Sequence, residues 1–367
     1  MYLDKLNLIN FKNYAQEELV FSPRLNCFVG NNGSGKTNVL DSIHYLCLCK
    51  SYFNAIDSQN IRHDEDFMVI QGNFQVKDEP EEIYCGIKRN KRKIFRRNKK
   101  EYQKLSEHIG LIPLVMISPA DSGLILDGSE ERRKFINSVI SQFDKSYLNT
   151  TIQYNHLILQ RNKLLKEFGR KHSYGEDTLE IYDEQIVPLG NKIYEKRVEF
   201  AERLVPIFQK YYNFISGGNE KVELIYQSQL EGNDFLELLR KNREKDKILQ
   251  YTTIGIHKDD LILNLDGYHI KKVGSQGQQK TFLVALKLAQ FDFIKEVNKI
   301  NPILLLDDIF DKFDVDRVKQ IIRLVSDHNY GQIFITHTNL DRMEAVLADI
   351  DIDYRLFLVE NGKINQN

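Results

Sequence analysis

The sequence lacks any apolar run that could cross a membrane. No segment approaches the roughly 18 uninterrupted apolar residues that a membrane helix needs. The first residues alternate apolar with polar side chains and carry Asp4 and Lys5, unlike a signal peptide. These absences exclude a membrane-spanning chain, and we expect a cytoplasmic protein with no membrane partner.

The sequence also has almost no net charge and few cysteines. Its 51 Lys and Arg residues against 52 Asp and Glu residues give a formal net charge of -1. A uniformly basic protein is therefore excluded, and any contact with nucleic acid must come from a local patch. The cysteines, Cys27, Cys47, Cys49 and Cys85, form no C-x-x-C pair. We expect reduced, buried thiols rather than a metal site.

What the chain does have is enough apolar material for a sizeable core. Hydrophobic residues make up 42% of the 367 positions and charged residues 28%. This composition is typical of a globular protein rather than a disordered one. The length allows two or three domains, or one large domain with an insertion.

The most informative stretch, residues 30–37, matches the phosphate-binding pattern G-x-x-x-x-G-K-[ST] at every fixed position. The apolar run 25–29 before it predicts a buried strand, and the apolar residues after it have helical spacing. Backbone N–H groups at such a helix start face phosphates. Lys36 adds charge for the β and γ phosphates, and the Thr37 hydroxyl can ligate Mg²⁺. The predicted nucleotide-binding residues are Gly30, Asn31, Asn32, Gly33, Ser34, Gly35, Lys36 and Thr37.

Strand patterns flank this loop. Residues 2–11 and 15–21 predict two strands joined by a turn that contains Lys12. Lys12 either approaches a bound nucleotide or is a solvated turn lysine, and the spacing does not decide between them. Further strands are expected at 67–76, 83–88 and 111–117, the last of which ends before Ser118 and Pro119.

The segment 88–100 carries the largest local excess of charge, since nine of its thirteen residues are basic. Ile94 and Phe95 between the charges predict a β-ribbon tip that can lie along a phosphate backbone. The alternative is a solvated hairpin without a partner. The candidate DNA-binding residues are Lys91, Arg92, Lys93, Arg96, Arg97, Lys99 and Lys100.

Residues 141–217 predict an inserted helical arm. Apolar residues recur every three or four positions from Tyr147 to Phe168 and again from Leu179 to Phe214, which predicts two amphipathic helices folded into an antiparallel hairpin. Pro188 and Pro206 should bend the second helix. We expect the arm to be structural, with a partner-binding surface as the alternative.

The segments 1–140 and 218–367 then remain as one domain built from both ends of the chain. In its C-terminal part, strands are expected at 222–226 and 261–265 around a charged helix at 235–249. The stretch Ser275–Lys280 precedes a strongly apolar helix, 282–293. A serine and a glycine at that helix start would form a second phosphate-facing surface.

Two buried strands complete this part. Residues 302–306 end in Asp307 and Asp308, where we expect one carboxylate on Mg²⁺ and a second that polarises water. The alternative is an ordinary strand end. A loop should follow at Asp311–Asp314. The second strand, 332–336, leads to His337, whose assignment depends on the other motifs.

Together these motifs resemble the ABC-type ATPase heads of the SMC class, and more closely the bacterial RecF family of recombination mediators. The closer resemblance extends nearly end to end and is carried by Asn10–Tyr14, Ser118–Pro119, Glu131–Phe135, His257–Asp260 and Ser275–Lys280. It implies an α/β fold, namely an ABC/SMC-type P-loop ATPase head of mixed sheet and helices with an inserted α-helical hairpin domain.

The resemblance also implies roles for site residues. Asp307 would support Mg²⁺, and Asp308 would be the catalytic carboxylate, acting with Lys36 and the switch histidine His337. Lys12 would be among the residues that bind ATP. Ser275, Gly277 and Gln278 would bind the ATP held by the other subunit of a homodimer. Asp308 is one methylene shorter than the usual glutamate, so we expect slow, weak ATP hydrolysis.

The implied function is ATP-dependent DNA binding in recombinational repair and replication-fork maintenance. The expected DNA is gapped or carries a junction of single and double strand, and the expected partners are RecR and RecO, with RecA loaded as the outcome. No convincing glutamine stands at Ser118–Pro119, where related heads have a loop that senses Mg²⁺, so that role is unassigned.

Three other classes of protein would each require a feature that can be looked for in the sequence. A transporter ATPase subunit would have a Leu-Ser-Gly-Gly-Gln signature, which the sequence lacks. An SMC-like tethering head would have a much longer hairpin than 141–217. An ATP-gated nuclease or toxin head would need an acidic metal domain, for which little chain follows His337.

Overall fold

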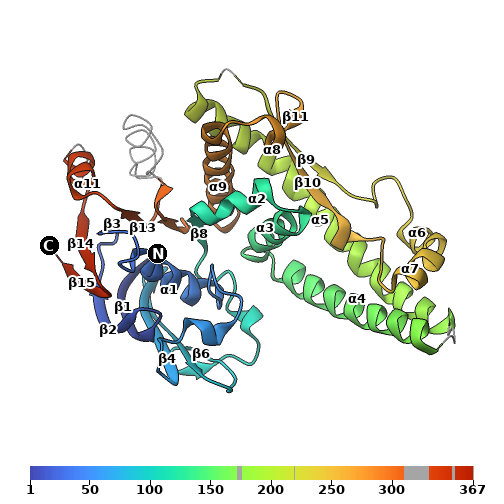
Figure 1. Ribbon diagram of the computed structural model, residues 1–367, viewed down its shortest axis with the longest axis horizontal. Coiled ribbons are helices and arrows are strands. Elements are labelled where there is room, and N and C mark those ends of the chain that lie inside the picture. The colour runs from blue at the N-terminus through green and yellow to red at the C-terminus, as the bar shows by residue number, and fades with distance from the viewer. Residues whose placement is uncertain (172–175, 219, 310–329, 349–351, 367) are drawn as a thin grey trace. The chain divides into compact units, whose positions relative to one another are not determined.

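The computed structural model describes residues 1–171, 176–218, 220–309, 330–348 and 352–366 (Figure 1). The predicted loop at Asp311–Asp314 lies outside these residues. The chain divides into two compact units.

The first unit contains Met1–Asp121 and Leu286–Asn367, so both ends of the chain build it. The second contains Ser122–Ala285. It is broader than the predicted arm 141–217 because the strands and short helices on either side pack against the long helices of the arm.

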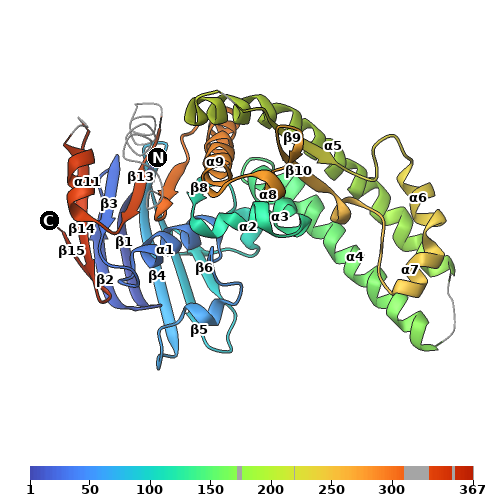
Figure 2. The same cartoon turned by 45° about the horizontal axis from the view of Figure 1, so that its top comes forward.

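An antiparallel sheet forms one layer of the first unit (Figure 2). Its order is β2-β1-β4-β5-β6-β7, with β1 (Tyr2–Phe11), β2 (Tyr14–Val20), β4 (Phe67–Val76), β5 (Glu79–Lys88), β6 (Ile94–Arg97) and β7 (Lys100–Glu101). Buried positions alternate with more exposed ones along β4 and β5, so one face packs on the core. The strands predicted at 2–11 and 67–76 are confirmed, and β6 and β7 form a small ribbon within and beyond the basic segment.

A second sheet carries the parallel strands. Its order is β15-β14-β3-β13-β12-β8, with β3 (Leu25–Val29), β8 (Leu114–Ile117), β12 (Ile303–Leu306), β13 (Ile333–His337), β14 (Tyr354–Glu360) and β15 (Lys363–Gln366). All pairs are parallel except β14 with β15. Every residue of β3, β8, β12 and β13 is buried, which explains why these strands are mostly apolar. The strands β14 and β15 were not predicted from the sequence.

The helix α1 (Lys36–Leu48) contacts strands of both sheets. It is therefore buried on nearly all sides, and Val39, Ile43 and Leu46 share one core with side chains of the two sheets. All four cysteines are buried and unpaired, as predicted. Burial raises the pKa of the Cys27 thiol to about 12. The unit also contains α11 (Leu340–Leu347) and the 3-10 helices η1 (Asp57–Asn60) and η2 (Leu105–Glu107), and η3 (Pro119–Ser122) lies at its boundary with the second unit.

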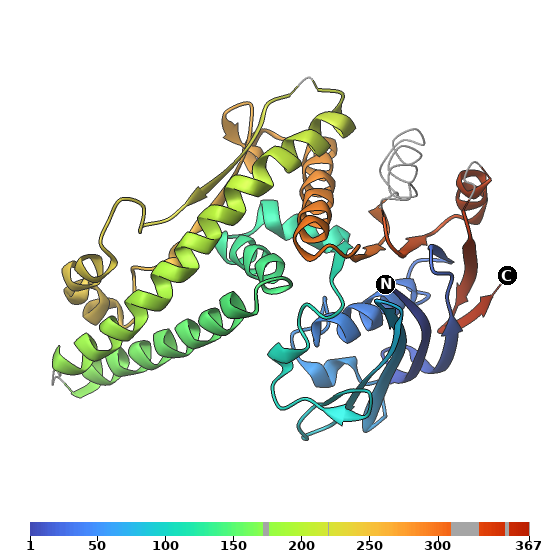
Figure 3. The same ribbon diagram turned by 180° about the vertical axis from the view of Figure 1, so that it is seen from behind.

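The second unit is organised on the two predicted long helices, α4 (Lys145–Lys171) and α5 (Glu176–Ser216). They meet at one end, where Leu165, Phe168 and Leu179 pack together, and diverge toward α3 (Ser129–Ser141) (Figure 3). Both Pro188 and Pro206 lie inside α5. The predicted hairpin is thus present.

The rest of the second unit packs around these helices. A small antiparallel sheet has the order β11-β10-β9, with β9 (Val222–Gln227), β10 (Asp260–Leu265) and β11 (Tyr268–His269). Besides α3, α4 and α5, the unit contains the helical elements α2 (Gly123–Leu126), α6 (Phe235–Lys241), α7 (Arg243–Leu249), α8 (Ile270–Val273) and η4 (Ile256–Lys258). The helix α9 (Gln276–Asn298) begins in this unit and continues into the first.

The single helix predicted at 235–249 is wrong. The segment forms α6 (Phe235–Lys241) and α7, with a break at Asn242. The Asn242 side chain donates a 2.9 Å hydrogen bond to Leu238 O, so the residue ends one helix locally and starts the next. Among the described helices, none combines the length and the apolar character needed to span a bilayer.

Candidate nucleotide-binding site

The phosphate loop, residues 30–37, joins the carboxyl end of β3 to α1, as predicted. Gly33 and Gly35 have φ of 79° and 121°, which favour glycine. A Cβ on Gly35 would lie 2.4 Å from Asn13 Nδ2, and one on Gly30 would lie 2.2 Å from Val359 O. The sequence pattern is therefore required by close packing behind the loop as well as by the loop's own backbone.

The turn between β1 and β2 holds the loop from behind. Tyr14 Oη donates to Gly35 O at 2.9 Å, and Asn13 Nδ2 donates to Ser34 O at 3.0 Å. Asn38 Nδ2, in the first turn of α1, donates to Asn13 Oδ1 at 2.7 Å. The first two bonds satisfy loop carbonyls on the rear side, and the third holds the Asn13 side chain in place. Sequence reasoning missed this use of Asn13 and Tyr14.

The chemistry of the loop fits a phosphate group. Ser34 Oγ is buried without a hydrogen-bond partner among the described residues. Lys36 is 3% exposed, and its Nζ donates to the loop carbonyls Gly30 O at 2.7 Å and Asn31 O at 3.1 Å. The start of α1 has no acidic residue in its first turn and no side-chain cap. An anion would therefore meet a buried donor, an ammonium group and helix N–H groups.

Asp307 lies next to the loop at the end of β12. Its Oδ1 accepts hydrogen bonds from Thr37 Oγ1 at 2.8 Å and Thr336 Oγ1 at 3.0 Å, and its Oδ2 accepts one from Ser118 Oγ at 3.3 Å. Burial raises the pKa of the Asp307 carboxyl. The structure thus brings together the predicted metal residues, Thr37 and Asp307, from opposite ends of the sequence.

This donor set suits Mg²⁺ better than a metal that needs a full protein cage. Mg²⁺ prefers oxygen ligands, keeps several waters and takes further ligands from substrate phosphates. A hydroxyl and one carboxylate beside a phosphate loop match that pattern. The described part of the chain has no group of three or more His, Cys, Asp or Glu side chains arranged to hold a metal ion.

Asp308 and His337 lie at neighbouring strand ends. Asp308 has a φ of 43°, and its backbone N donates to Thr336 Oγ1 at 2.8 Å. His337 is 5% exposed, and its Nδ1 accepts a hydrogen bond from Asn339 N at 2.9 Å, which leaves the proton of the neutral ring on Nε2. The His337 carbonyl accepts a bond from Gly30 N at 3.2 Å, so this strand end is tied to the phosphate loop.

Lys12 is neither solvated nor pointed freely at the loop. Its Nζ lies 2.5 Å from Asp41 Oδ2, and the Asp41 side chain is fully buried in α1. The Lys12 ammonium also lies 5.4 Å from the centre of the Phe53 ring. The ion pair anchors the turn that holds the loop, a role that spacing could not indicate.

Ser275, Gly277 and Gln278 lie at the exposed start of α9. Ser275 Oγ accepts from Gln278 N at 3.3 Å, and Gln278 Oε1 accepts from Ser275 N at 2.7 Å, which is a reciprocal capping box. Gln278 Nε2 also donates to Glu220 Oε1 at 2.7 Å. A Cβ on Gly277 would meet only Ser275 Oγ, at 4.0 Å. The motif is held in shape locally while Ser275 and Gly277 stay open to a ligand.

The basic segment is less available than its charge suggests. Lys93 Nζ pairs with Asp57 at 2.9 Å and donates to Cys49 O at 2.7 Å, with its side chain 13% exposed. Arg97 binds Glu81 through two nitrogens. These two cations serve the fold of the first unit. The exposed candidates are Lys91, Arg92, Lys99 and Lys100, whereas Arg96 is half-buried with its guanidinium 5.6 Å from the centre of the Tyr84 ring.

The motifs at 131–135 and 257–260 form a buried ionic network in the second unit. Arg132 makes a two-point contact with Asp260 at 2.6 and 3.0 Å, and Arg133 donates to Asp259 O at 2.7 Å. Arg197, 1% exposed, pairs with Asp259 at 2.8 Å. Burial lowers the pKa of His257 to about 4. These ion pairs join α3 and α5 to the start of β10.

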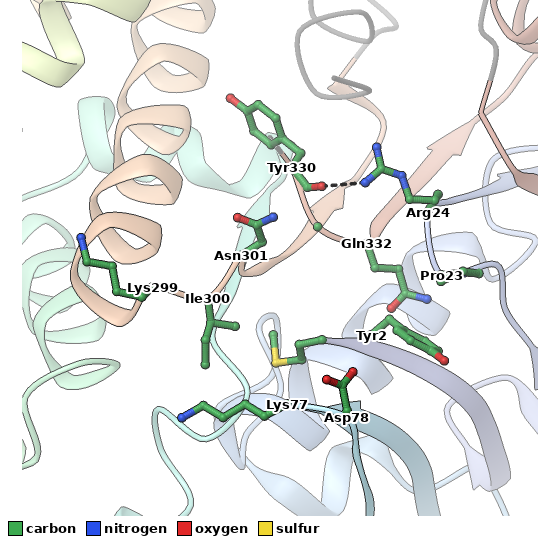
Figure 4. Close-up of a pocket in the computed structure, with 12 residues that line it drawn as sticks. Tyr2, Pro23, Arg24, Lys77, Asp78, Lys299, Ile300, Asn301, Tyr330 and Gln332 are labelled. Carbon is green, nitrogen blue, oxygen red and sulfur yellow. Dashed lines mark hydrogen bonds between the residues drawn. The ribbon is translucent and has the colours of Figure 1, made fainter. Parts of the chain in front are cut away.

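A separate cavity of about 460 Å³ lies at the amino ends of the same parallel strands (Figure 4). Arg24 precedes β3, Asn301 precedes β12, and Gln332 precedes β13 at its rim. The Gln332 side chain donates a hydrogen bond to Leu3 O and accepts one from Leu3 N. None of the predicted site residues lines this cavity.

Known structures share this fold. A structure described as "the recombination mediator protein RecF-ATP in RecFOR pathway" superposes with a TM-score of 0.90 at 30% sequence identity, covering 100% of this chain and 97% of that one. An SMC head bound to the C-terminal winged-helix domain of ScpA superposes with a TM-score of 0.60 at 17% identity, covering 100% and 98%. Fold and site define a P-loop ATPase head of the SMC class.

Sequence comparison narrows the class. The profile of the family described as "RecF/RecN/SMC N terminal domain" matches residues 2–365. The "DNA replication and repair protein RecF" of Parabacteroides distasonis is 53% identical over 364 residues, covering 99% of each chain. The protein of the same name from Flavobacterium johnsoniae is 51% identical over 357 residues, covering 97% of this chain and 99% of the relative. The chain belongs to the RecF family.

Proposed function

We propose that this chain is an ATP-dependent DNA-binding protein of recombinational repair and replication-fork maintenance. Two copies close around ATP on gapped DNA or on a junction of single and double strand, and with RecO and RecR they promote the loading of RecA in the cytoplasm. The observation that carries the proposal is the Thr37 hydroxyl on Asp307, 2.8 Å away, beside the phosphate loop. The names of the relatives and the solved ATP complexes of RecF support it.

One subunit supplies the phosphate and metal half of the site. Lys36 leaves the carbonyls of Gly30 and Asn31 and contacts the β and γ phosphates, while Ser34 Oγ gains the partner that it lacks among the described residues. Thr37 and Asp307 hold Mg²⁺. When bound, Mg²⁺ neutralises phosphate charge. Asp308 orients the attacking water. His337, at the end of the neighbouring strand, acts as the switch histidine.

The second subunit supplies the other half. Ser275, Gly277 and Gln278 at the start of α9 face the γ-phosphate held by the first copy. Because the capping box already fixes the serine, little order has to be created when the dimer closes. Hydrolysis removes the shared phosphate and the dimer opens.

Hydrolysis should be slow. Asp308 reaches one methylene less far than a glutamate, so the water is oriented less well. Slow turnover suits a protein whose ATP-bound dimer has to persist while a recombinase assembles.

The helices α4 and α5 have 27 and 41 residues. At about 1.5 Å per residue they are too short for the long coiled coil of a tethering head.

The DNA surface is proposed at the β6–β7 ribbon. Lys91, Arg92, Arg96, Lys99 and Lys100 supply its charge, whereas Lys93 and Arg97 serve mainly in ion pairs. Contacts of this kind bind phosphates without reading base sequence, which fits recognition of a DNA structure rather than of a sequence.

The test is DNA binding with and without ATP, on gapped duplex, intact duplex and single strand of equal length. We expect ATP to strengthen binding to the gapped duplex most, and Lys36→Ala to remove the effect of ATP. Equal binding to the three DNAs with no effect of ATP would contradict the proposal. The loss of ATP dependence in Lys36→Ala with retained basal binding would separate the nucleotide site from the DNA surface.

A further inference from the structure

A buried lysine on α9 pairs with an aspartate at the end of the turn that follows β8. Lys287 Nζ lies 2.6 Å from Asp121 Oδ1, and the two side chains are 7% and 4% exposed. Removing two charges from water is costly unless the geometry is good and further hydrogen bonds are made. The surroundings of Asp121 supply those bonds.

Asp121 fixes the turn that contains Ser118. Ser118 N donates to Asp121 Oδ2 at 2.8 Å, and Asp121 N donates to Ser118 O at 3.0 Å. The turn is thereby closed through both side chain and backbone. It presents Ser118 Oγ to Asp307 Oδ2 at 3.3 Å. A continuous chain of contacts joins Lys287 to Asp307.

Tyr52 ties the same turn to α1. Its hydroxyl donates to Asp121 Oδ1, and its backbone N donates to Asp41 Oδ1 at 2.6 Å. Asp41 belongs to α1, the helix that begins with Lys36 and Thr37. The carboxylate of Asp307 is therefore approached on Oδ1 by Thr37 from α1 and on Oδ2 by Ser118 from the turn, and both approaches lead back to Asp121.

We infer that Lys287 is a positioning residue for the metal carboxylate. Through Asp121 it holds the turn that sets Ser118 against Asp307 Oδ2, and this leaves Oδ1 directed toward Thr37. The inference rests on the proposed function and deepens it, since it names a residue that supports the metal site at the turn where related heads have a glutamine. Lys287 lies on the helix whose start carries Ser275, so one helix serves both halves of the proposed nucleotide site.

The test measures how binding of the fluorescent analogue mant-ATP depends on Mg²⁺. Substitution of a residue that supports a metal ligand typically lowers the affinity for the metal by about 10–100-fold. We expect Lys287→Met to raise the half-saturating Mg²⁺ concentration about tenfold, at the lower end of that range because it acts through Asp121 and Ser118. Binding in EDTA should be unchanged. Lys287→Arg keeps the charge and should restore most of the Mg²⁺ dependence.

The control is Lys5→Met, which removes a lysine of β1 whose 2.6 Å pair with Glu18 touches no member of the chain of contacts. It should match the wild type. Where Lys287→Met alone fails to fold by circular dichroism, the double variant Asp121→Asn with Lys287→Met leaves no unpaired buried charge and carries the same expectation.

Unchanged Mg²⁺ dependence in a folded Lys287→Met variant would overturn the inference and leave the proposed function intact. The same shift in Lys5→Met would also overturn it, because any lost lysine would then suffice. A wild-type protein that binds no mant-ATP with or without Mg²⁺ would overturn the proposed function and this inference with it.

Discussion

Replacing Gly35 by alanine should loosen the phosphate loop and the start of α1 by about 3 kcal/mol. A residue other than glycine at a φ of 121° carries strain of about 1–3 kcal/mol. The new Cβ would lie 2.4 Å from Asn13 Nδ2 and 2.7 Å from Tyr14 Oη, so both side chains have to move. Their hydrogen bonds to the loop carbonyls are then weakened, at about 0.5–1.5 kcal/mol each.

Hydrogen exchange of the nucleotide-free protein measures this effect, through the opening free energy of the α1 amides. The matched control is Gly33→Ala. Gly33 also has positive φ, at 79°, but nothing lies within 4 Å of its added Cβ. It should lose only about 1 kcal/mol from strain. The remaining difference of about 2 kcal/mol corresponds to about 30-fold in the opening equilibrium. Equal exchange of α1 in the two variants would refute the idea that the hairpin turn enforces the loop geometry.

Three other predictions follow from the site and the network. Lys36→Ala and Ser275→Ala should each abolish ATP-driven dimerisation in light scattering, and unchanged dimers in both would exclude a shared nucleotide. Replacing Arg96, Lys99 and Lys100 by alanine should flatten the log–log salt dependence of DNA binding by up to about 0.9 per lost phosphate contact. Arg97→Ala should change it less, because Arg97 is paired with Glu81; a wild-type slope in the triple variant would place the DNA elsewhere. Burial lowers the pKa of His257 from 6.5 to about 4, so its contribution to stability is complete above pH 6.5 and is lost as the pH falls toward 4. Unfolding free energy should drop by about 2 kcal/mol by pH 5, and His257→Gln should remove that dependence in melts at pH 5 and 7.

Local patterns were sufficient where burial alone shapes the sequence. The strands before Gly30 and Asp307 are almost entirely apolar because both faces are covered, and the helices α4 and α5 keep a regular apolar stripe. The partner of a charged side chain is set by chain segments far away, as with Lys12 and Asp41 or Lys93 and Asp57. Charge counting therefore could not anticipate which cations of the basic segment the fold uses in ion pairs.

The parallel direction of the strands explains which site residues could be predicted from the sequence to be neighbours and which could not. Carboxyl ends of parallel strands meet at one sheet edge, so residues that follow buried strands, Gly30, Ser118, Asp307 and His337, become neighbours whatever their distance in sequence. Ser118 also reaches this edge because it follows a buried strand, and its Oγ donates to Asp307 Oδ2, although the sequence alone left its role unassigned. The same rule cannot place Ser275, which starts a helix and follows no such strand. Its capping box fixes the serine at an exposed helix start, where a second copy can reach it in the proposed dimer. That is what a site completed by a second copy requires of each chain.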